Sequence, residues 1–214
     1  MPGKRVFDLG QLEWSVAGYL PSAWLAKSME LGFAMEPEIP PVPARVPGSV
    51  QGALRAAGRL PDWYEGLNSR ACEWVENRDW MYSAQLPDAW FAEGRRFVLD
   101  GEGLDGNGIV VFNGHRVGEF ANAFLPHRFD LTAHVRRADN RLHLIFFTPQ
   151  RWLGQIGYTS QMKDWKPRFN YTWDWIPRLV QIGPWEPVTL TATDGAEIAQ
   201  FRCRGDWEVA EATG

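Results

Sequence analysis

The alternation of apolar and polar residues predicts short β-strands over most of the chain. Six segments combine β-branched and aromatic residues, and several are separated by turn residues at intervals of roughly 8–12 residues, as in sandwiches and barrels. They are Trp80–Leu86, Arg95–Asp100, Ile109–Asn113, Arg116–Phe120, Leu142–Phe147 and Val188–Ala192. No amphipathic helices of the usual length alternate with them, so the pattern favours an all-β fold over a parallel α/β sheet.

Turn residues and the chain ends refine this picture. Asn113-Gly114 lies between two of the strands and is typical of a type I′ hairpin turn. Glu13–Tyr19 adds a strand-like piece near the N-terminus. Residues 198–207 predict either a last strand of the sandwich or the first strand of a following domain.

Helical signals are few and short. Ser49 can cap a helix over residues 49–57, and Gly58 can end it. The pattern over residues 69–75 predicts one or two helical turns, and that over residues 130–135 predicts one turn before the next strand. The proline-rich stretch 36–48 predicts an extended, irregular connection.

A long piece with little regular pattern joins Phe147 to Val188, and long ordered loops on a rigid scaffold tend to carry function. It contains the sequence YTWDWIPRL, which begins at Tyr171. In an extended segment, Trp173 and Trp175 would share one face and Asp174 would point the other way.

Composition narrows the classes of partner. The chain has 214 residues with 45% hydrophobic and 22% charged residues, which is ordinary for a globular protein. The net charge is −4 without a basic block, so neither nucleic acid nor an anionic membrane is expected as a partner. Without an apolar leader or a membrane-length apolar run, we expect a cytoplasmic chain.

Tryptophan is the compositional outlier. There are 12 tryptophans, and five of them fall between Trp152 and Trp185. An indole ring serves either as a core anchor or as a stacking platform for ring-shaped ligands. The two cysteines, Cys72 and Cys203, favour free buried thiols over a disulfide framework, and no metal-ligand spacing occurs. We therefore expect no metal or other cofactor.

Several motifs, in order along the chain, resemble the N-terminal sugar-binding domain of glycoside hydrolase family two, most closely its β-mannosidase-like members. They cover nearly the whole chain from about residue 44, and together they are fairly specific. The matching pieces are ARVPGSV at 44–50, GRLPDWYEGLN at 58–68, DWMYS at 79–83, LDGEGLDGNGIVVFNGHRVGEFANAFLPHRFDLT at 99–132, NRLHLIF at 140–146 and KPRFNYTWDWIPRLVQIGPWEPVTL at 166–190.

The resemblance implies a galactose-binding-like jelly-roll β-sandwich. In this interpretation residues 1–43 are an N-terminal strand and extension packed on the sandwich, 44–193 are the jelly roll, and 194–214 are a last strand or a linker. In the family the sandwich precedes an immunoglobulin-like domain and a (β/α)₈ barrel that carries both catalytic glutamates. No Asn-Glu pair, the family's acid/base signature, occurs here. We expect a piece without catalytic residues from a retaining glycosidase, inactive alone, whose partners are those domains and a β-mannoside or related glycoside.

The resemblance also assigns site residues. It implies that Asp174 reaches into the active site and accepts hydrogen bonds from sugar hydroxyls. Alternatives from the residues themselves are an ion pair with Arg178 or Arg168, or a solvated turn. Trp173 and Trp175 are expected to pack the loop, with direct sugar stacking as the alternative.

Further positions near the motif each have two competing roles or depart from the family pattern. Asn68 lies where related enzymes place an asparagine near the sugar, and turn capping is the competing role. The family motif has glycine on either side of Trp-Asp-Trp, or at least after it, where Thr172 and Ile176 stand here, so the loop's shape is expected to differ. Lys163, Lys166 and Arg168 are expected on a solvated loop face, with contact to a partner domain or an acidic sugar as the alternative.

Three functions follow from these observations. The first is an auxiliary domain that contributes part of a sugar subsite. The second is a self-sufficient carbohydrate-binding module. The third is a purely structural domain that supports a barrel through a tryptophan-rich interface.

Overall fold

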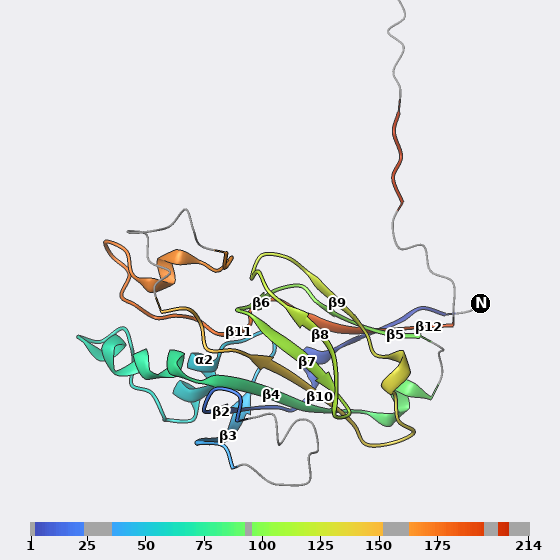
Figure 1. Cartoon of the computed structure of the whole chain (residues 1–214), viewed down its shortest axis with the longest axis horizontal. Helices are drawn as coiled ribbons and strands as arrows, with labels where there is room; N and C mark the ends of the chain where they lie inside the picture. The colour runs from blue at the N-terminus through green and yellow to red at the C-terminus, as the bar shows by residue number, and fades with distance from the viewer. Residues whose placement is uncertain (1–2, 24–35, 93–95, 152–162, 195–200, 206–214) are drawn as a thin grey trace, which may run out of the picture.

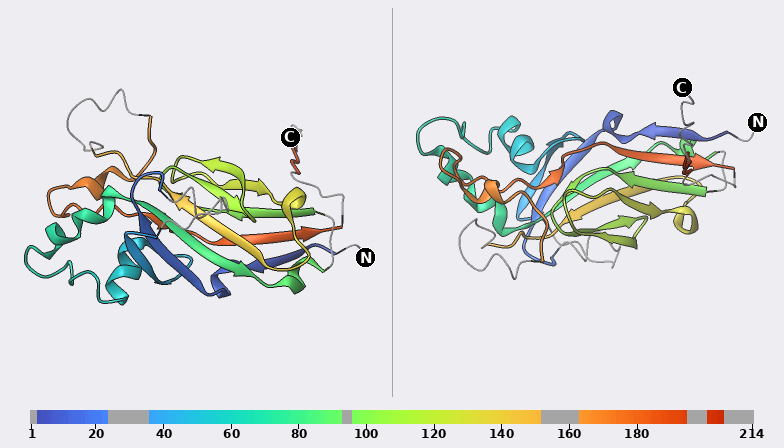
Figure 2. Two further views of the ribbon diagram at one scale, coloured as in Figure 1. Left: turned by 60° about the horizontal axis from the view of Figure 1, so that its bottom comes forward. Right: turned by 90° about the horizontal axis from the view of Figure 1, so that it is seen from above.

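Two antiparallel sheets pack around one apolar core in the computed structural model, which describes residues 3–23, 36–92, 96–151, 163–194 and 201–205 (Figures 1 and 2). The larger sheet has the order β3 (Ile39–Ala44), β2 (Trp14–Tyr19), β4 (Asp79–Leu86), β10 (Asn140–Phe146), β7 (Gly108–Phe112) and β8 (His115–Phe120). The smaller sheet has the order β1 (Arg5–Asp8), β12 (Val188–Thr193), β5 (Arg96–Gly101) and β9 (His127–Asp130). A short pair joins β11 (Gly183–Pro184) to β6 (Leu104–Asp105). This all-β jelly-roll sandwich is the predicted fold class.

Alternation along the strands explains the core. On β7, Val110 and Phe112 join the main core between the sheets, whereas Ile109 and Val111 join a second buried cluster. Strand β7 is therefore buried on both faces, which explains its nearly continuous apolar sequence.

The predicted strands are confirmed, with boundaries that differ by at most two residues. The hairpin at Asn113-Gly114 is confirmed as well, because both residues have positive φ, 52° and 82°, as a type I′ turn requires. Strand β9 is an addition that the sequence pattern does not predict. The stretch expected to be irregular contains strand β3, whose prolines are tolerated because β3 lies at the sheet edge and its pairing with β2 is irregular between Val16 and Gly18.

The short helices also follow local signals. Helix α2 (Val50–Ala56) begins after Ser49, whose Oγ accepts a hydrogen bond from the Gly52 N–H at 3.1 Å, and Gly58 follows with φ 68°. A longer 3₁₀ segment, η2 (Asn68–Asn77), occupies the second predicted position. The other 3₁₀ turns among the described residues are η1 (Leu9–Gln11), η3 (Asp88–Phe91), η4 (Thr132–His134) and η6 (Arg168–Tyr171).

The structure near the two ends of the chain can be compared with the strands predicted there. Strands β1 to β3 begin before residue 44 and pair within both sheets, so this part of the chain, expected to supply a strand and an extension, contributes strands to both sheets. Much of the strand predicted over 198–207 lies outside the described residues, and 201–205 carry no strand. Cys72 is a buried free thiol as expected, whereas Cys203 is exposed.

Candidate functional site

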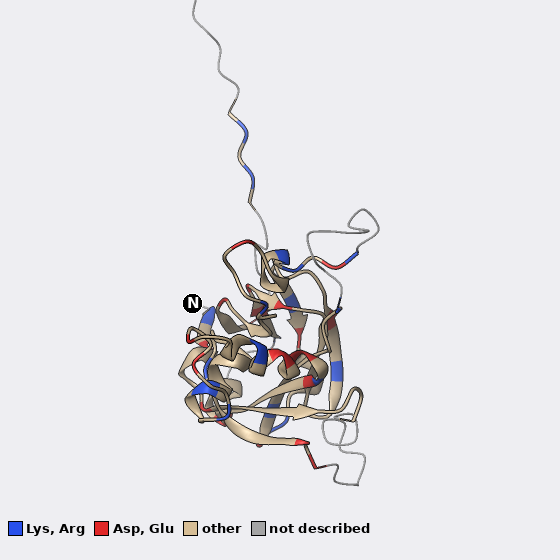
Figure 3. Cartoon of the chain, turned by 90° about the vertical axis from the view of Figure 1, so that its left-hand side faces the viewer, with Lys and Arg blue, Asp and Glu red and all other residues tan. Residues whose placement is uncertain are grey.

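Segments far apart in the sequence meet at one end of the sandwich. The views of Figure 2 place residues 57–77 and 163–182 at the same end. Direct contacts join them to each other and to α2: the Arg178 guanidinium binds Glu76, and the Gln51 side chain donates to the Val180 carbonyl at 2.5 Å. Figure 3 views the molecule from this side, where basic and acidic residues both occur.

Asp174 lies at the tip of a tight turn. The Trp173 N–H donates to the Ile176 carbonyl at 3.1 Å, and the Ile176 N–H donates back to the Trp173 carbonyl at 3.3 Å. The chain therefore reverses over Asp174 and Trp175, and the extended geometry expected from the sequence is wrong. The alternation of faces that we inferred for the two tryptophans does not apply, because a turn breaks the two-residue period.

The carboxylate of Asp174 is exposed, and within the described part of the chain it makes no hydrogen bond or ion pair. Arg178 is not its partner: Nε and Nη2 of Arg178 donate to the two carboxylate oxygens of Glu76, each at 2.8 Å. No ion pair joins Arg168 to Asp174 either among the residues described. The ion-pair alternatives for Asp174 are therefore wrong, and the group faces solvent.

The flanking indole rings are also exposed. Trp173 is 42% exposed and Trp175 is 77% exposed, so neither ring is a buried anchor. Trp175 borders a hollow of about 440 Å³ whose lining also includes Trp63 and Tyr64. The roles of Trp173 and Trp175 in packing and in sugar binding stay predictions.

The Asn68 side chain forms a hydrogen bond within its own turn. Its side-chain Nδ2 donates to the Asp62 carbonyl at 3.0 Å, at the start of η2. This contact agrees with the turn-capping alternative, and the proposed contact with sugar stays a prediction.

Thr172 has an unusual backbone conformation, with φ 125° and ψ 149°. That region is populated almost only by glycine and costs about 1–3 kcal/mol for other residues. The resemblance places glycine here, so the chain keeps a glycine-like backbone with a threonine. Ile176 is not among the described residues with positive φ, so the departure at that position does not force strain.

Lys166 anchors the loop from inside. Its ammonium donates to Asp105 Oδ1 at 2.6 Å and also to the Gln181 carbonyl, and the two charged side chains are only 4% and 3% exposed. The expectation that Lys166 is solvated is wrong, because Asp105 on β6 offers a buried counterion. Burial raises the pKa of Asp105 and lowers the pKa of Lys166, while each partner opposes the shift of the other.

The Arg178–Glu76 pair forms a second anchor. Glu76 is 8% exposed and belongs to η2, and the Arg178 guanidinium also lies over the Tyr171 ring at 4.9 Å from its centroid. Burial raises the pKa of the Tyr171 hydroxyl, and the nearby Glu76 carboxylate raises it further. Sequence reasoning missed both anchors because partner choice between distant segments leaves no local pattern.

The described residues contain neither a cluster of metal ligands nor a membrane-length helix. No cluster of three or more His, Cys, Asp or Glu side chains there is placed to hold a metal ion. No helix among them is both long enough and apolar enough to cross a membrane.

The facing antiparallel sheets with loops gathered at one end define a galactose-binding-like β-sandwich. Residues 30–186 match the family described as glycosyl hydrolase 2 galactose-binding domain-like. The match spans most of the chain, and the chain belongs to this family.

Relatives and solved structures agree with this assignment. The chain is 31% identical over 160 residues to β-mannosidase B of Thermothelomyces thermophilus, covering 69% of this chain and 19% of that protein. It is 29% identical to β-mannosidase A of Emericella nidulans, covering 68% of this chain and 17% of that protein. Among solved structures, β-D-mannosidase from Dictyoglomus thermophilum superposes with a TM-score of 0.71 at 25% identity, covering 88% of this chain and 22% of that chain. The chain thus spans about a fifth of the length of these proteins.

Proposed function

We propose that this chain is the non-catalytic N-terminal domain of a β-mannosidase-like glycoside hydrolase and that it contributes Asp174 to a sugar subsite completed by another domain. The observation that carries the proposal is an exposed carboxylate, without a partner in the described part of the chain, at the tip of a doubly hydrogen-bonded turn. The similarity to β-mannosidases supports the substrate class, a β-mannoside or related glycoside.

The chemistry of Asp174 suits a sugar. An ionised carboxylate offers several acceptor positions and forms charge-assisted hydrogen bonds with hydroxyl donors. A site built to bind a hydroxyl discriminates strongly against a sugar that lacks or misplaces it. The two ion-pair anchors hold the loop, so the carboxylate is positioned before the sugar arrives.

The pairing of the nearby carboxylates supports the proposed non-catalytic role. A retaining glycosidase uses two carboxyl groups about 5 Å apart. Around this turn, Glu76 is bonded to Arg178 and Asp105 to Lys166, so neither carboxylate is available to pair with Asp174.

Binding by the isolated chain separates this proposal from a self-sufficient module. Titration of the 214-residue chain with methyl β-D-mannopyranoside, followed by calorimetry, is expected to show no saturable binding below about 1 mM, because most contacts belong to another domain. Saturable binding below about 1 mM that disappears in Asp174→Ala would make the chain an independent carbohydrate-binding module.

Activity of the longer enzyme separates it from a purely structural domain. Asp174→Asn there is expected to lower kcat/KM for p-nitrophenyl β-D-mannopyranoside by about 10- to 150-fold, the value of one hydrogen bond to a charged group. Glu13→Gln, at another exposed carboxylate without a partner among the described residues, is the matched control. Equal activity of both variants would leave only the structural role.

A further inference from the structure

We propose that the hollow beside Asp174 binds a second, uncharged pyranose ring, the neighbour of the sugar that Asp174 contacts. The inference rests on the proposed function and extends it from one sugar to two. The hollow has a volume of about 440 Å³, and its lining includes Trp63, Tyr64, Asn170, Trp175 and Gln181. Trp175 directly follows Asp174, so both belong to one turn.

The first wall is aromatic and held in place. Tyr64 is 82% exposed, and its ring lies 6.0 Å from that of Trp63. The Arg55 guanidinium lies 4.6 Å from the centroid of the Trp63 ring and binds Asp62 Oδ2 at 2.7 Å. Asp62 Oδ1 accepts from the Tyr64 N–H at 3.1 Å, so one aspartate fixes both the cation and the backbone of this wall.

The second wall is the indole of Trp175. Its turn is closed by the two hydrogen bonds between Trp173 and Ile176, and the loop is tied to η2 by Arg178. Two large exposed aromatic side chains, Trp175 and Tyr64, therefore border one hollow on separate supports. Exposed apolar surface of this kind marks an interaction site, and aromatic faces suit the C–H surface of a sugar ring.

Amides supply the polar contacts of the hollow. Gln51 is already used, because it bonds to the backbone of Val180 and Ile182. The side-chain amides of Asn170 and Gln181 make no hydrogen bond within the part of the chain that is described, so each can donate to and accept from a sugar hydroxyl.

The lack of charged side chains in the described lining of the hollow indicates which class of sugar it binds. Among the described residues, no Lys, Arg, Asp or Glu lines the hollow, and the nearby Arg55 is paired with Asp62. A uronic acid would have to leave its carboxylate without a cation, which is costly in a partly desolvated site. The lining therefore fits a neutral saccharide.

The test is an NMR titration of the 214-residue chain with β-1,4-mannobiose to about 50 mM, read at the indole N–H signals. We expect the signals of Trp63 and Trp175 to move with a Kd of about 1–30 mM, since a single shallow subsite gives only weak binding. Trp175→Ala and Tyr64→Ala are expected to weaken this binding at least tenfold. Both side chains are mostly exposed, so these variants retain the fold, which their thermal unfolding checks.

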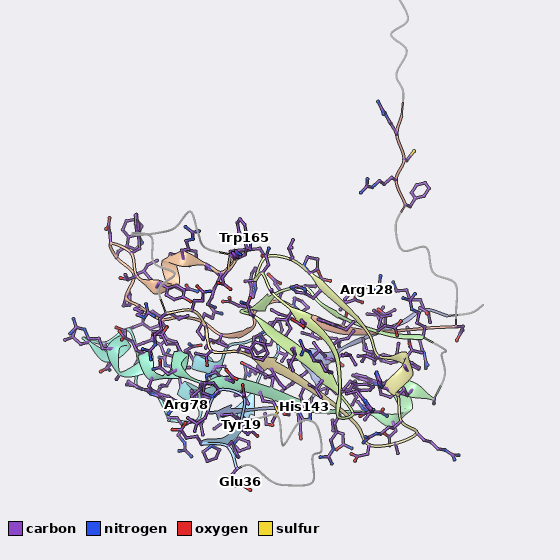
Figure 4. All side chains as sticks on the ribbon, in the orientation of Figure 1. Tyr19, Glu36, Arg78, Arg128, His143 and Trp165 are labelled. Atoms are coloured by element: carbon purple, nitrogen blue, oxygen red, sulfur yellow. The ribbon has the colours of Figure 1, made fainter. Side chains whose placement is uncertain are left out.

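Two controls make the experiment specific. Trp165→Ala removes another exposed indole (Figure 4), which borders a separate small hollow with Gly106 and Asn107, and is expected to leave the titration unchanged. D-glucuronate over the same concentrations is expected to move neither signal. Unmoved signals with mannobiose, equal movement with glucuronate, or movement that survives Trp175→Ala would each overturn the inference.

The result of the mannobiose titration can be separated from the proposed role of Asp174. In Asp174→Asn the mannobiose shifts at Trp63 are expected to persist, while activity of the longer enzyme falls. If mannobiose moves neither indole signal while Asp174→Asn still lowers the activity of the longer enzyme, this inference is refuted and the proposed role of Asp174 stands.

Discussion

The buried Lys166–Asp105 pair offers the sharpest test of how the loop is held. In Lys166→Met the side chain keeps most of its length and apolar volume, so the main change is loss of the ammonium. Asp105, 3% exposed at its side chain, then keeps a buried charge without its cation, and the Gln181 carbonyl loses a donor. Removing one partner of such a pair costs about 3–5 kcal/mol, and we expect this loss of unfolding free energy at neutral pH.

The dependence of this loss on pH identifies its cause. Without Lys166, burial raises the folded-state pKa of Asp105 further above its unfolded value of about 3.9. When the pKa of Asp105 is higher in the folded state than in the unfolded state, protonation of this group stabilises the folded state. That stabilisation is complete below the unfolded-state pKa and is lost as pH rises through the folded-state pKa. The deficit of Lys166→Met is therefore expected to be full at neutral pH and to narrow as pH falls towards 4, by at most about 1.4 kcal/mol per pH unit.

Urea unfolding followed by tryptophan fluorescence, at about pH 7 and about pH 4.5, measures both quantities for the wild type and the variant. Lys166→Met/Asp105→Leu completes a double-mutant cycle. It is expected to recover most of the loss, because a hydrophobic replacement of both partners leaves no buried unpaired charge. A deficit below about 1 kcal/mol at neutral pH, or one that does not narrow in acid, would refute this account of the anchor.

Three further predictions concern the same end of the molecule. Thr172→Gly is expected to raise stability by about 0.5–2 kcal/mol, since relief of the backbone strain exceeds the added chain entropy; a lower Tm would contradict the strained conformation. Glu76→Gln is expected to cost about 1.5–3 kcal/mol and to speed amide hydrogen exchange over residues 171–179, with unchanged exchange as the contrary result. Ser49→Ala is expected to cost about 1 kcal/mol through loss of the cap of α2, while Ser49→Asp restores it in the same urea assay; equal loss in both would remove the capping account.

Local patterns in the amino-acid sequence determine much of the fold. The hairpin follows from Asn113-Gly114, because those two residues adopt the positive φ values of its turn at low cost. The helix after Ser49 follows from its cap and from Gly58. The tryptophan-rich loop is also recognisable locally, because an aspartate between two indoles is distinctive without knowledge of its neighbours.

Other features are decided only where distant segments meet. A lysine such as Lys166 is expected to be solvated unless β6 brings Asp105 beneath it. Asp174 is left without a partner in the described part of the chain because Glu76, 98 positions earlier, takes Arg178. The turn over Asp174 and the hollow beside it depend on these anchors, since burial and pairing energies belong to contacts between segments. The sequence alone therefore determined the residue types of the candidate site, and the tertiary structure decided which of them remain exposed.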